Sequence, residues 1–505
     1  MERPDAEPRL ASEAAPRHPG TRRPAPRPDP AAAPLPSAPP FRLRARILTP
    51  LPGGATRFLP DGLLEVDAAG RITSVSPWQA PDGTVEPGQA VGPDTAPIHD
   101  LRPLLLLPGL VDLHTHVPQL PNAGIGAGLD LLTWLERYTL PLERSFDVPT
   151  AERLAPLAFR AYAAAGTTTV AAYATADPAA TEAVFAAAEA HGIRAAIGLV
   201  LMDRGVGSTE IDRWPSGTEQ LDASAALCAR WHGRDGGRLR YAVTPRFAVS
   251  CSADLLRASV RLAGETGALW QTHLSEDPRE LAEVRRAFPG AADYLAVYEA
   301  AGALGPRALF AHAIHLSAGE VARLAASGSG IAHCPASNLF LPSGVMPLAS
   351  YLAAGLKVGL GSDVSGGPSP SLFETMRAGF YAGHALQSLA PGGPPPIVDP
   401  LAWLRLATLD GAGAIGLADL VGSLEAGKEA DLVAVDPRPT EPVPGASCRD
   451  DPAELVSRLI FRTHPEMVRA AWVRGRLLPT GPSSRGPVSP LPAIRSDRDP
   501  ARSRR

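Results

Sequence analysis

The central part of the chain alternates between short apolar or β-branched runs and longer stretches with helical spacing. The eight runs are Leu110–His116, Thr167–Thr175, Arg194–Asp203, Leu239–Phe247, Leu269–Glu276, Ala308–Leu316, Gly330–Asn338 and Lys357–Val364. The clearest helical stretches are Pro178–His191, Ala253–Thr266, Ser317–Ala326 and Ser371–Leu386. Strands that alternate with helices indicate parallel βα units, and eight units in roughly 300 residues predict a (β/α)₈ barrel. A doubly wound open sheet is the alternative, but it would need a Gly-rich phosphate loop after an early strand, and neither GxGxxG nor GxxxxGK[ST] occurs there.

The two flanks of this region have a different pattern, in which apolar and polar residues alternate between Gly, Pro and Asp turns. Phe41–Pro77 shows this pattern at one end, and Ala430–Asp436 and Met467–Leu478 show it at the other. Alternation with a period of two is typical of half-buried strands. We therefore expect a small β-sandwich domain built from residues 41–107 and 421–479, with the barrel, residues 108–420, inserted between its halves.

The ends of the chain have the composition of disordered segments. Residues 1–40 hold 12 prolines and six arginines with almost no large apolar residues. Such a segment buries too little apolar surface to offset the entropy of ordering it, so residues 1–40 and 480–505 are predicted to be disordered. The N-terminal segment lacks the apolar stretch of a secretory signal, and its acidic residues and prolines argue against a mitochondrial presequence.

Composition excludes several classes of function. Among the 505 residues the formal net charge is −4, which argues against a dedicated nucleic-acid binder. The four cysteines lie far apart, as expected in a reducing compartment, so we expect a cytoplasmic protein. No apolar run reaches the ~20 residues that a membrane helix needs.

Histidines and a carboxylate stand where the apolar runs end. His114 and His116 close the first run, and alternation directs both imidazoles to the same face. This HxH pair alone is a weak signal, because two polar loop histidines would look the same.

The later runs repeat the feature. His273, His312, His333 and Asp363 stand at or near the ends of the fifth to eighth runs. Catalytic groups of a barrel project from the carboxyl ends of its strands, so these side chains are expected to meet. Imidazoles and a carboxylate suit a borderline divalent ion such as Zn²⁺, and three His, one Asp and a water would leave an open catalytic position.

This set of residues resembles the amidohydrolase superfamily, and longer motifs narrow the resemblance to the guanine deaminase family. They are PGLVDLHTHVPQ, LLTWLERYTLPLE, TPRFAVSCS, QTHLSE, AHCPASNL, GLGSDVSGG and GSLEAGKEADL, and the resemblance extends from about Phe41 to Leu478. It implies hydrolytic deamination of guanine to xanthine and ammonia in purine catabolism. It also implies a homodimer with a small-molecule substrate and no membrane or nucleic-acid partner.

The resemblance implies one metal ion per chain, Zn²⁺ with Fe²⁺ as the alternative, held by His114, His116, His273 and Asp363. Superfamily members with two metals use a carbamylated lysine at the end of the fourth strand. Here that strand reads LRYAVTPRF, and the only lysines of the chain are Lys357 and Lys428. We therefore expect a mononuclear site.

The expected mechanism uses three side chains. A bound metal brings the pKa of water from ~15.7 towards ~7, and Asp363 can take the proton that this water loses. Glu276, in HLSE, is the candidate proton shuttle to the ring nitrogen and the departing amine. In similar enzymes the residue at His312 hydrogen-bonds the attacking oxygen. The alternative for Glu276 is the solvated start of the next helix.

Besides Glu276, which is also expected to contact the substrate, four side chains are candidates for substrate binding. Arg246 offers a donor fork for a carbonyl or ring nitrogen, and Gln119 can donate and accept along an amide edge. Phe247 and Trp134 can form walls for a flat ring. A structural salt bridge for Arg246 and core packing for the two aromatic rings are the alternatives.

Two positions depart from the family pattern. His315 closely follows His312 and is expected to be a loop residue or an indirect contact, and Ala336 replaces a frequent asparagine. Other functions remain open: a deaminase or hydrolase of 8-oxoguanine, a pterin, cytosine or an s-triazine, or a barrel without catalysis that serves as a scaffold.

Overall fold

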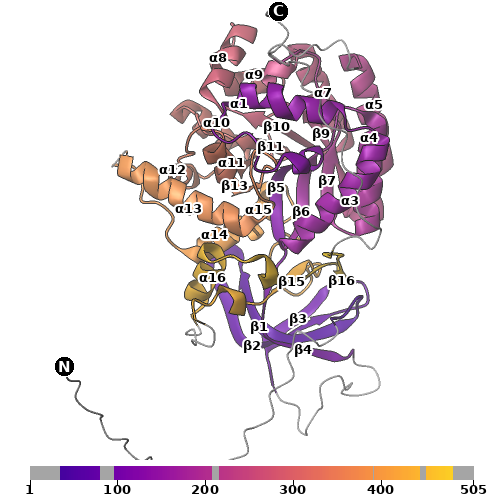
Figure 1. Cartoon of the computed structure of the whole chain (residues 1–505), viewed down its shortest axis with the longest axis vertical. Coiled ribbons are helices and arrows are strands. Elements are labelled where there is room, and N and C mark those ends of the chain that lie inside the picture. Colours follow the sequence, from indigo (N-terminus) through magenta and orange to yellow (C-terminus); the bar gives the residue numbers. More distant parts are fainter. Residues whose placement is uncertain (1–34, 80–95, 207–214, 390–391, 444–450, 482–505) are drawn as a thin grey trace, which may run out of the picture.

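The computed structural model describes residues 35–79, 96–206, 215–389, 392–443 and 451–481. A barrel ringed by helices lies above a smaller β-sheet region that contains both the earliest and the latest described strands (Figure 1). Most of the two predicted disordered tails, residues 1–34 and 482–505, lies outside the described residues.

The barrel consists of parallel strands in the order β13-β12-β11-β10-β9-β7-β6-β5. Their bounds are β5 Leu110–His116, β6 Thr167–Tyr173, β7 Arg194–Gly198, β9 Leu239–Pro245, β10 Leu269–Leu274, β11 Ala308–His312, β12 Gly330–His333 and β13 Lys357–Leu360, and β8 (Val200–Leu201) pairs with β9 outside this order. The chain after β13 closes the ring on β5, because Asp363 N donates to His114 O over 2.7 Å and His116 N donates to Val364 O over 3.0 Å. The predicted (β/α)₈ fold is confirmed.

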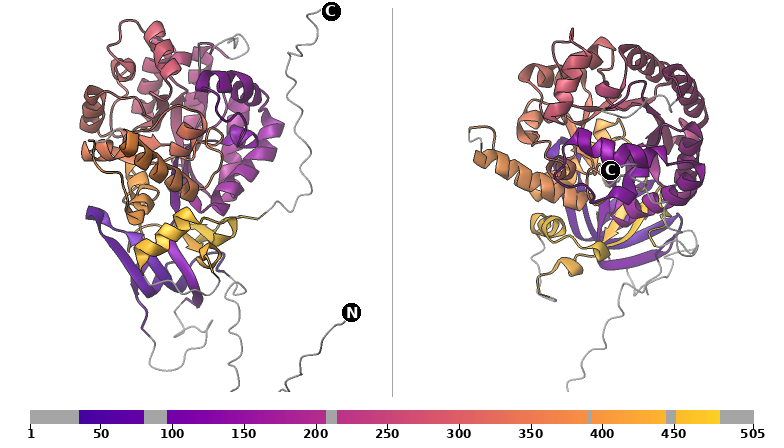
Figure 2. Two further views of the ribbon diagram at one scale, coloured as in Figure 1. Left: turned by 60° about the vertical axis from the view of Figure 1, so that its left-hand side comes forward. Right: turned by 45° about the horizontal axis from the view of Figure 1, so that its top comes forward.

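Helices surround the barrel (Figure 2). Their bounds are α1 Leu131–Trp134, α2 Leu140–Arg144, α3 Val148–Ala164, α4 Pro178–His191, α5 Gly217–Trp231, α6 Arg234–Gly237, α7 Ala253–Thr266, α8 Pro278–Ala287, α9 Tyr294–Ala300, α10 Ala318–Ser327, α11 Pro335–Phe340, α12 Leu348–Ala353, α13 Leu372–Leu389, α14 Pro400–Leu406, α15 Leu409–Ala414 and α16 Pro452–Phe461. Local sequence sets several ends: Asp177 caps the start of α4, Gly192 ends it in a left-handed conformation, and Ser317 with Glu320 forms a capping box on α10. Within the described residues, no helix is both long and apolar enough to cross a membrane.

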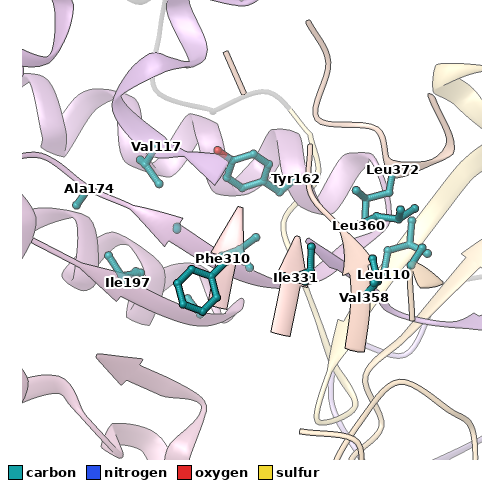
Figure 3. Packing of buried hydrophobic residues seen from close by; sticks show 14 of the residues in the cluster. Leu110, Val117, Tyr162, Ala174, Ile197, Phe310, Ile331, Val358, Leu360 and Leu372 are labelled. Atoms are coloured by element: carbon teal, nitrogen blue, oxygen red, sulfur yellow. The ribbon is translucent and has the colours of Figure 1, made fainter. Parts of the chain in front are cut away.

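Apolar side chains fill the space between the barrel strands and the helices. Figure 3 shows part of this cluster, in which Phe310, Ile331 and Val358 come from successive strands and Tyr162 from α3. Each of the four is 2% exposed or less. Full burial of such a side chain contributes roughly 1.5–3 kcal/mol, so this layer holds the strand ends that carry the site.

The second sheet joins both flanks of the chain. Its strands are β1 Phe41–Pro50, β2 Thr56–Val66, β3 Ile72–Pro77, β4 Ile98–Pro108, β14 Leu432–Val435, β15 Val468–Val473 and β16 Arg476–Leu477, in the order β16-β15-β14-β4-β1-β2-β3. One side of this sheet encloses a core of its own that includes Leu43, Leu64, Leu106, Leu432 and Trp472. One short link, Gly109, connects β4 directly to the first barrel strand.

Two features correct the expectations for the flanks. The disorder predicted for residues 1–40 is wrong for residues 35–40, because Pro36 O accepts a 2.8 Å hydrogen bond from Trp472 Nε1 and Leu35 packs on the sheet core. Trp472, the hydrogen-bond partner of this segment, lies more than 400 residues further along the chain. Helix α16 also interrupts the strands of the second flank.

Candidate metal centre and substrate pocket

Five polar side chains meet at the carboxyl ends of the barrel strands. His114 and His116 come from β5, His273 from β10, His312 ends β11, and Asp363 follows β13. The ligand atoms of His114, His116 and His273 lie within 4.8 Å of one another, and so do those of His114, His312 and Asp363. The sequence expected these residues together, and the structure places them in one group.

Three of them converge on a single point. His114 Nε2 and His116 Nε2 lie 3.3 Å apart, and they lie 3.2 Å and 3.3 Å from the same oxygen, Asp363 Oδ1. His273 Nδ1 lies 2.7 Å from the backbone oxygen of Arg246, which accepts its proton. That hydrogen bond fixes the tautomer in which Nε2 of His273 carries a free lone pair, as the hydrogen-bond partners of metal-binding histidines do.

The electrostatics fit a divalent cation. Burial lowers the pKa of both His114 and His273, so their imidazoles are neutral at pH 7. Burial alone would raise the pKa of Asp363, but His114 and the other nearby histidines hold it well below its usual range. Neutral imidazoles and a carboxylate are the forms that bind a metal ion, so these residues suit one.

Glu276 and His312 form a second pair beside this centre. Glu276 Oε2 lies 3.3 Å from His312 Nε2, while Asn338 Oδ1 accepts from His312 Nδ1 over 2.9 Å. Burial and the charge of Asp363 raise the pKa of Glu276 well above its usual range. Burial lowers the pKa of His312 to about 4. A protonated carboxyl therefore faces a neutral imidazole, which is a suitable arrangement for moving a proton.

The backbone at three of these strand ends is strained. Ser275, His312 and Asp363 have φ angles of 49°, 67° and 48°, in the left-handed region that L-residues rarely occupy. Such outliers persist only where surrounding structure holds them, and they concentrate at functional sites. Here each one turns the chain out of the sheet beside the metal-type ligands.

A small cavity of about 20 Å³ lies beside the candidate metal centre. Its lining residues are His116, Gln119, Leu131, Trp134, Leu135, Arg246, Phe247, His273, Glu276, Leu341 and Asp363. The structure thus places Gln119, Trp134, Arg246 and Phe247 on one cavity, together with the metal-type ligands His116, His273 and Asp363. The leucine walls escaped the sequence analysis, since apolar residues of short helices look like ordinary core residues.

Glu143 on α2 is a further buried charge of this region that sequence reasoning missed. One carboxylate oxygen accepts from Gln119 Nε2 over 2.6 Å, and the other pairs with Arg246 Nη1. Glu143 is 3% exposed. The only sequence signal was its place in the motif LLTWLERYTLPLE, where it resembles a solvated helix residue.

Asp112 on β5 is the second residue that was missed. Its carboxylate accepts from Ser362 N over 2.9 Å, from Ser362 Oγ over 2.5 Å and from His114 N over 3.2 Å. It therefore fastens the chain after β13 to the strand that carries both histidines of the HxH pair. Burial raises the pKa of Asp112 to about 7.

Other residues considered for the site lie away from it. His315 Nε2 donates to Ser343 O over 2.7 Å, and His333 faces a separate apolar cavity beside α13. Lys428 Nζ donates to Ala418 O over 2.6 Å, while Lys357 opens β13 at the opposite end of the barrel from the site. Both lysines of the chain are thereby placed outside the group of metal-type ligands.

The sequence matches the model of the amidohydrolase family over residues 105–478. A probable guanine deaminase of Deinococcus radiodurans is 40% identical over 380 residues, which cover 75% of this chain and 83% of that protein. The guanine deaminase of Escherichia coli is 35% identical over 434 residues, which cover 84% of this chain and 92% of that protein.

Solved structures give the same result. A guanine deaminase from C. acetobutylicum, with guanine bound in its active site, superposes with a TM-score of 0.77. It is 27% identical in sequence, and the match covers 87% of this chain and 99% of that one. The likeness therefore includes both the barrel and the smaller sheet.

Proposed function

The chain belongs to the amidohydrolase family, and on that basis we propose that it is a guanine deaminase, which hydrolyses guanine to xanthine and ammonia. One observation carries the proposal. In a chain that matches guanine deaminases along most of its length, a single pocket is lined both by His116, His273 and Asp363 and by Gln119, Arg246 and Phe247.

We propose that one divalent ion per chain, Zn²⁺ in preference to Fe²⁺, is held by His114, His116, His273 and Asp363. Three imidazoles and one carboxylate are a donor set that zinc accepts, with a position left for substrate. When bound, the ion supplies a nucleophilic water at neutral pH and polarises the atom that is attacked. The lack of a lysine on β9 supports a single ion.

The chain's own side chains then move the protons. Asp363 takes the proton that the attacking water loses. Glu276, kept protonated by its surroundings, delivers its proton to the ring nitrogen next to the amino-bearing carbon. It then regains the proton that Asp363 took from the water and passes this proton to the departing amine. The new hydroxyl on the carbon loses its own proton to Glu276 as the carbonyl forms, which restores both carboxyl groups. His312 holds the attacking oxygen through Nε2, since Asn338 already occupies its other nitrogen.

We assign purine recognition to the other polar and aromatic residues that line the pocket. Arg246 donates to the carbonyl oxygen of guanine, and Gln119 pairs with an edge nitrogen. Phe247 and Trp134 contact the faces and rim of the ring, and both are 3% exposed or less. Trp134 is itself fixed by a 2.9 Å hydrogen bond from Nε1 to Ile125 O.

We further propose that the chain is a cytoplasmic protein and that it forms a homodimer. Sedimentation of the purified chain tests the dimer.

A substrate panel tests the proposed function. Metal-loaded protein is incubated with guanine, 8-oxoguanine, adenine, cytosine, pterins and an s-triazine, and product formation is followed for each. We expect the highest kcat/KM with guanine. A higher value with another aminated heterocycle would overturn the substrate assignment while leaving the reaction class, and turnover of none of them would support the scaffold alternative.

A further inference from the structure

One buried carboxylate holds the recognition wall of the pocket, by which we mean the proposed purine-binding side chains Gln119 and Arg246. Glu143 contacts both side chains that are expected to bind the purine, since its two oxygens accept from Gln119 Nε2 and Arg246 Nη1. Arg246 and Glu143 have side chains only 3% and 2% exposed. Solvent cannot screen either charge, so the carboxylate of Glu143 and the guanidinium of Arg246 neutralise each other.

The same carboxylate fixes the orientation of an amide. An ionised carboxylate only accepts hydrogen bonds, so the amide of Gln119 must turn its NH₂ group towards Glu143. The opposite end, Gln119 Oε1, accepts from Ser365 N over 3.3 Å. The amide is thus held at both ends, and the pattern of donors offered to a ligand is set before it arrives.

We propose that Glu143 is a specificity-determining positioning residue that keeps the recognition wall neutral and oriented, so that the pocket prefers a neutral purine over a purine anion. This inference rests on the proposed function, in which guanine enters and xanthine leaves. Xanthine is the stronger acid and loses a proton near neutral pH, whereas guanine stays neutral there. Charge balance by Glu143 therefore favours the substrate and disfavours the ionised product.

Loss of the negative charge has a specific consequence. In Glu143→Gln the guanidinium of Arg246 stays buried without a carboxylate, and a buried unpaired charge is strongly unfavourable. A purine anion would then supply the missing charge. The other ionisable groups that line the pocket, namely His116, His273, Glu276 and Asp363, are the same in every variant, so their effects cancel in the comparison.

Calorimetric titration of xanthine tests the inference on the full-length, metal-loaded chain, at pH values below and above the first ionisation of xanthine. The proteins are wild type, Glu143→Gln, and Glu152→Gln as a control that removes an exposed carboxylate from α3. We expect xanthine to bind wild type and the control more weakly once it is ionised. In Glu143→Gln we expect the opposite trend, with the ratio of the two Kd values shifted by about tenfold or more.

Kinetics and a second variant separate this role from a merely structural one. With guanine, Glu143→Gln should raise KM more than it lowers kcat, because the purine-holding donors are disturbed and the proton shuttle is not. If Glu143→Gln is poorly folded, Glu143→Gln combined with Arg246→Gln removes both charges, and its preference for ionised xanthine should vanish.

Several results would overturn the inference. They are an unchanged pH trend of xanthine binding in Glu143→Gln, an equal shift in Glu152→Gln, or no xanthine binding by any of the proteins. Because the readout is binding, a wild-type chain that binds xanthine but fails to convert guanine would refute the proposed function alone.

Discussion

Two carboxylates at the barrel mouth have opposite surroundings. Asp363 lies among histidines that favour its charged form, whereas Glu276 is buried beside that charge and favours its protonated form. A pair of acids whose environments separate their pKa values can divide the work of base and acid. We assign the role of general base to Asp363 and the role of proton donor to Glu276.

Glu276→Gln tests this division. The amide keeps the size of the side chain but cannot carry the proton, so we expect kcat for guanine to fall by about 10²–10⁴-fold, the usual contribution of general acid–base catalysis. Metal content, measured by elemental analysis, should stay at the wild-type value, because Glu276 is not among the proposed ligands.

His114→Ala provides the contrast. We expect this variant to lose both bound metal and turnover, and the wild type to hold one ion per chain at full activity. Two ions per chain in the fully active enzyme, or full metal content in His114→Ala, would contradict the proposed ligand set.

The sequence could predict the residues of the site only where a local pattern marks them. The two-residue period of a strand and the position where a strand ends can both be read from neighbouring residues. These two signals indicated His114, His273 and Asp363. Glu143 and Asp112 gain their meaning from partners 103 and 250 residues away, Arg246 and Ser362. A carboxylate in a helical stretch or a strand gives no sign of such a distant partner.

Among the elements, the hydrogen-bonded contact between β5 and the chain after β13, here called the joint, determines how firmly the proposed metal ligands are held. Asp112 makes that joint through Ser362 and His114. Asp112→Ala would leave these donors unpaired, at a cost of about 1–3 kcal/mol for each buried group. We expect a lower Tm and a metal affinity weaker by about 10–100-fold.

Competition with a metal-sensitive dye measures this affinity. Ser362→Ala is the matched variant, since it removes the hydroxyl and keeps the backbone donor, so its effect should be smaller. Equal metal affinity in wild type and Asp112→Ala would show that the joint does not hold the ligands.

The end of α4 carries a pH-dependent element of stability. His191 closes that helix, lies near Pro479 O at 2.9 Å from Nε2, and has its pKa lowered to about 4 by burial. The unfolded chain binds a proton more readily, with a pKa of ~6.5. The stability contributed by neutral His191 is therefore full above that value and is lost as pH falls towards about 4, by at most about 3 kcal/mol.

His191→Gln, which retains an amide donor for Pro479, removes this loss. We expect the difference in unfolding free energy between wild type and variant, from urea titrations, to change in favour of the variant as the pH is lowered. A difference that is the same at neutral and acidic pH would refute this assignment.

Sequence periodicity predicted the elements better than their ends. The stretch Pro178–His191 is α4 itself, because an Asp-Pro start and a Gly stop mark it locally. The run Ala308–Leu316, by contrast, is a strand only as far as His312, where the backbone turns left-handed. Helix α16 was missed although it opens with the same kind of Asp-Pro signal, Asp451–Pro452.

At the scale of the whole molecule, the smaller sheet ties the two ends of the chain together. Residues 35–40 belong to it, because Ser37 O accepts from Leu477 N over 3.1 Å and Pro36 O accepts from Trp472 Nε1. We expect a chain that begins at residue 35 to keep the wild-type Tm. One that begins at residue 41 should lose about 2–4 °C for each kcal/mol removed.

Differential scanning calorimetry of the two truncated chains makes this comparison. Equal Tm values would mean that residues 35–40 contribute nothing to the sheet. A fall already in the longer chain would contradict the expectation that residues 1–34 form a disordered tail.

We propose that this barrel hydrolyses the amino group of guanine with water held in the pocket of His116, Arg246 and Glu276. The most direct test of this proposal is a reaction of guanine with the metal-loaded chain in ¹⁸O-labelled water, followed by mass spectrometry of the purine and an assay of ammonia. We expect xanthine with a single labelled oxygen, one ammonia for each xanthine, and formation of both products about 10²–10⁴-fold more slowly with Glu276→Gln. Guanine recovered unchanged from the wild-type reaction would contradict the proposal.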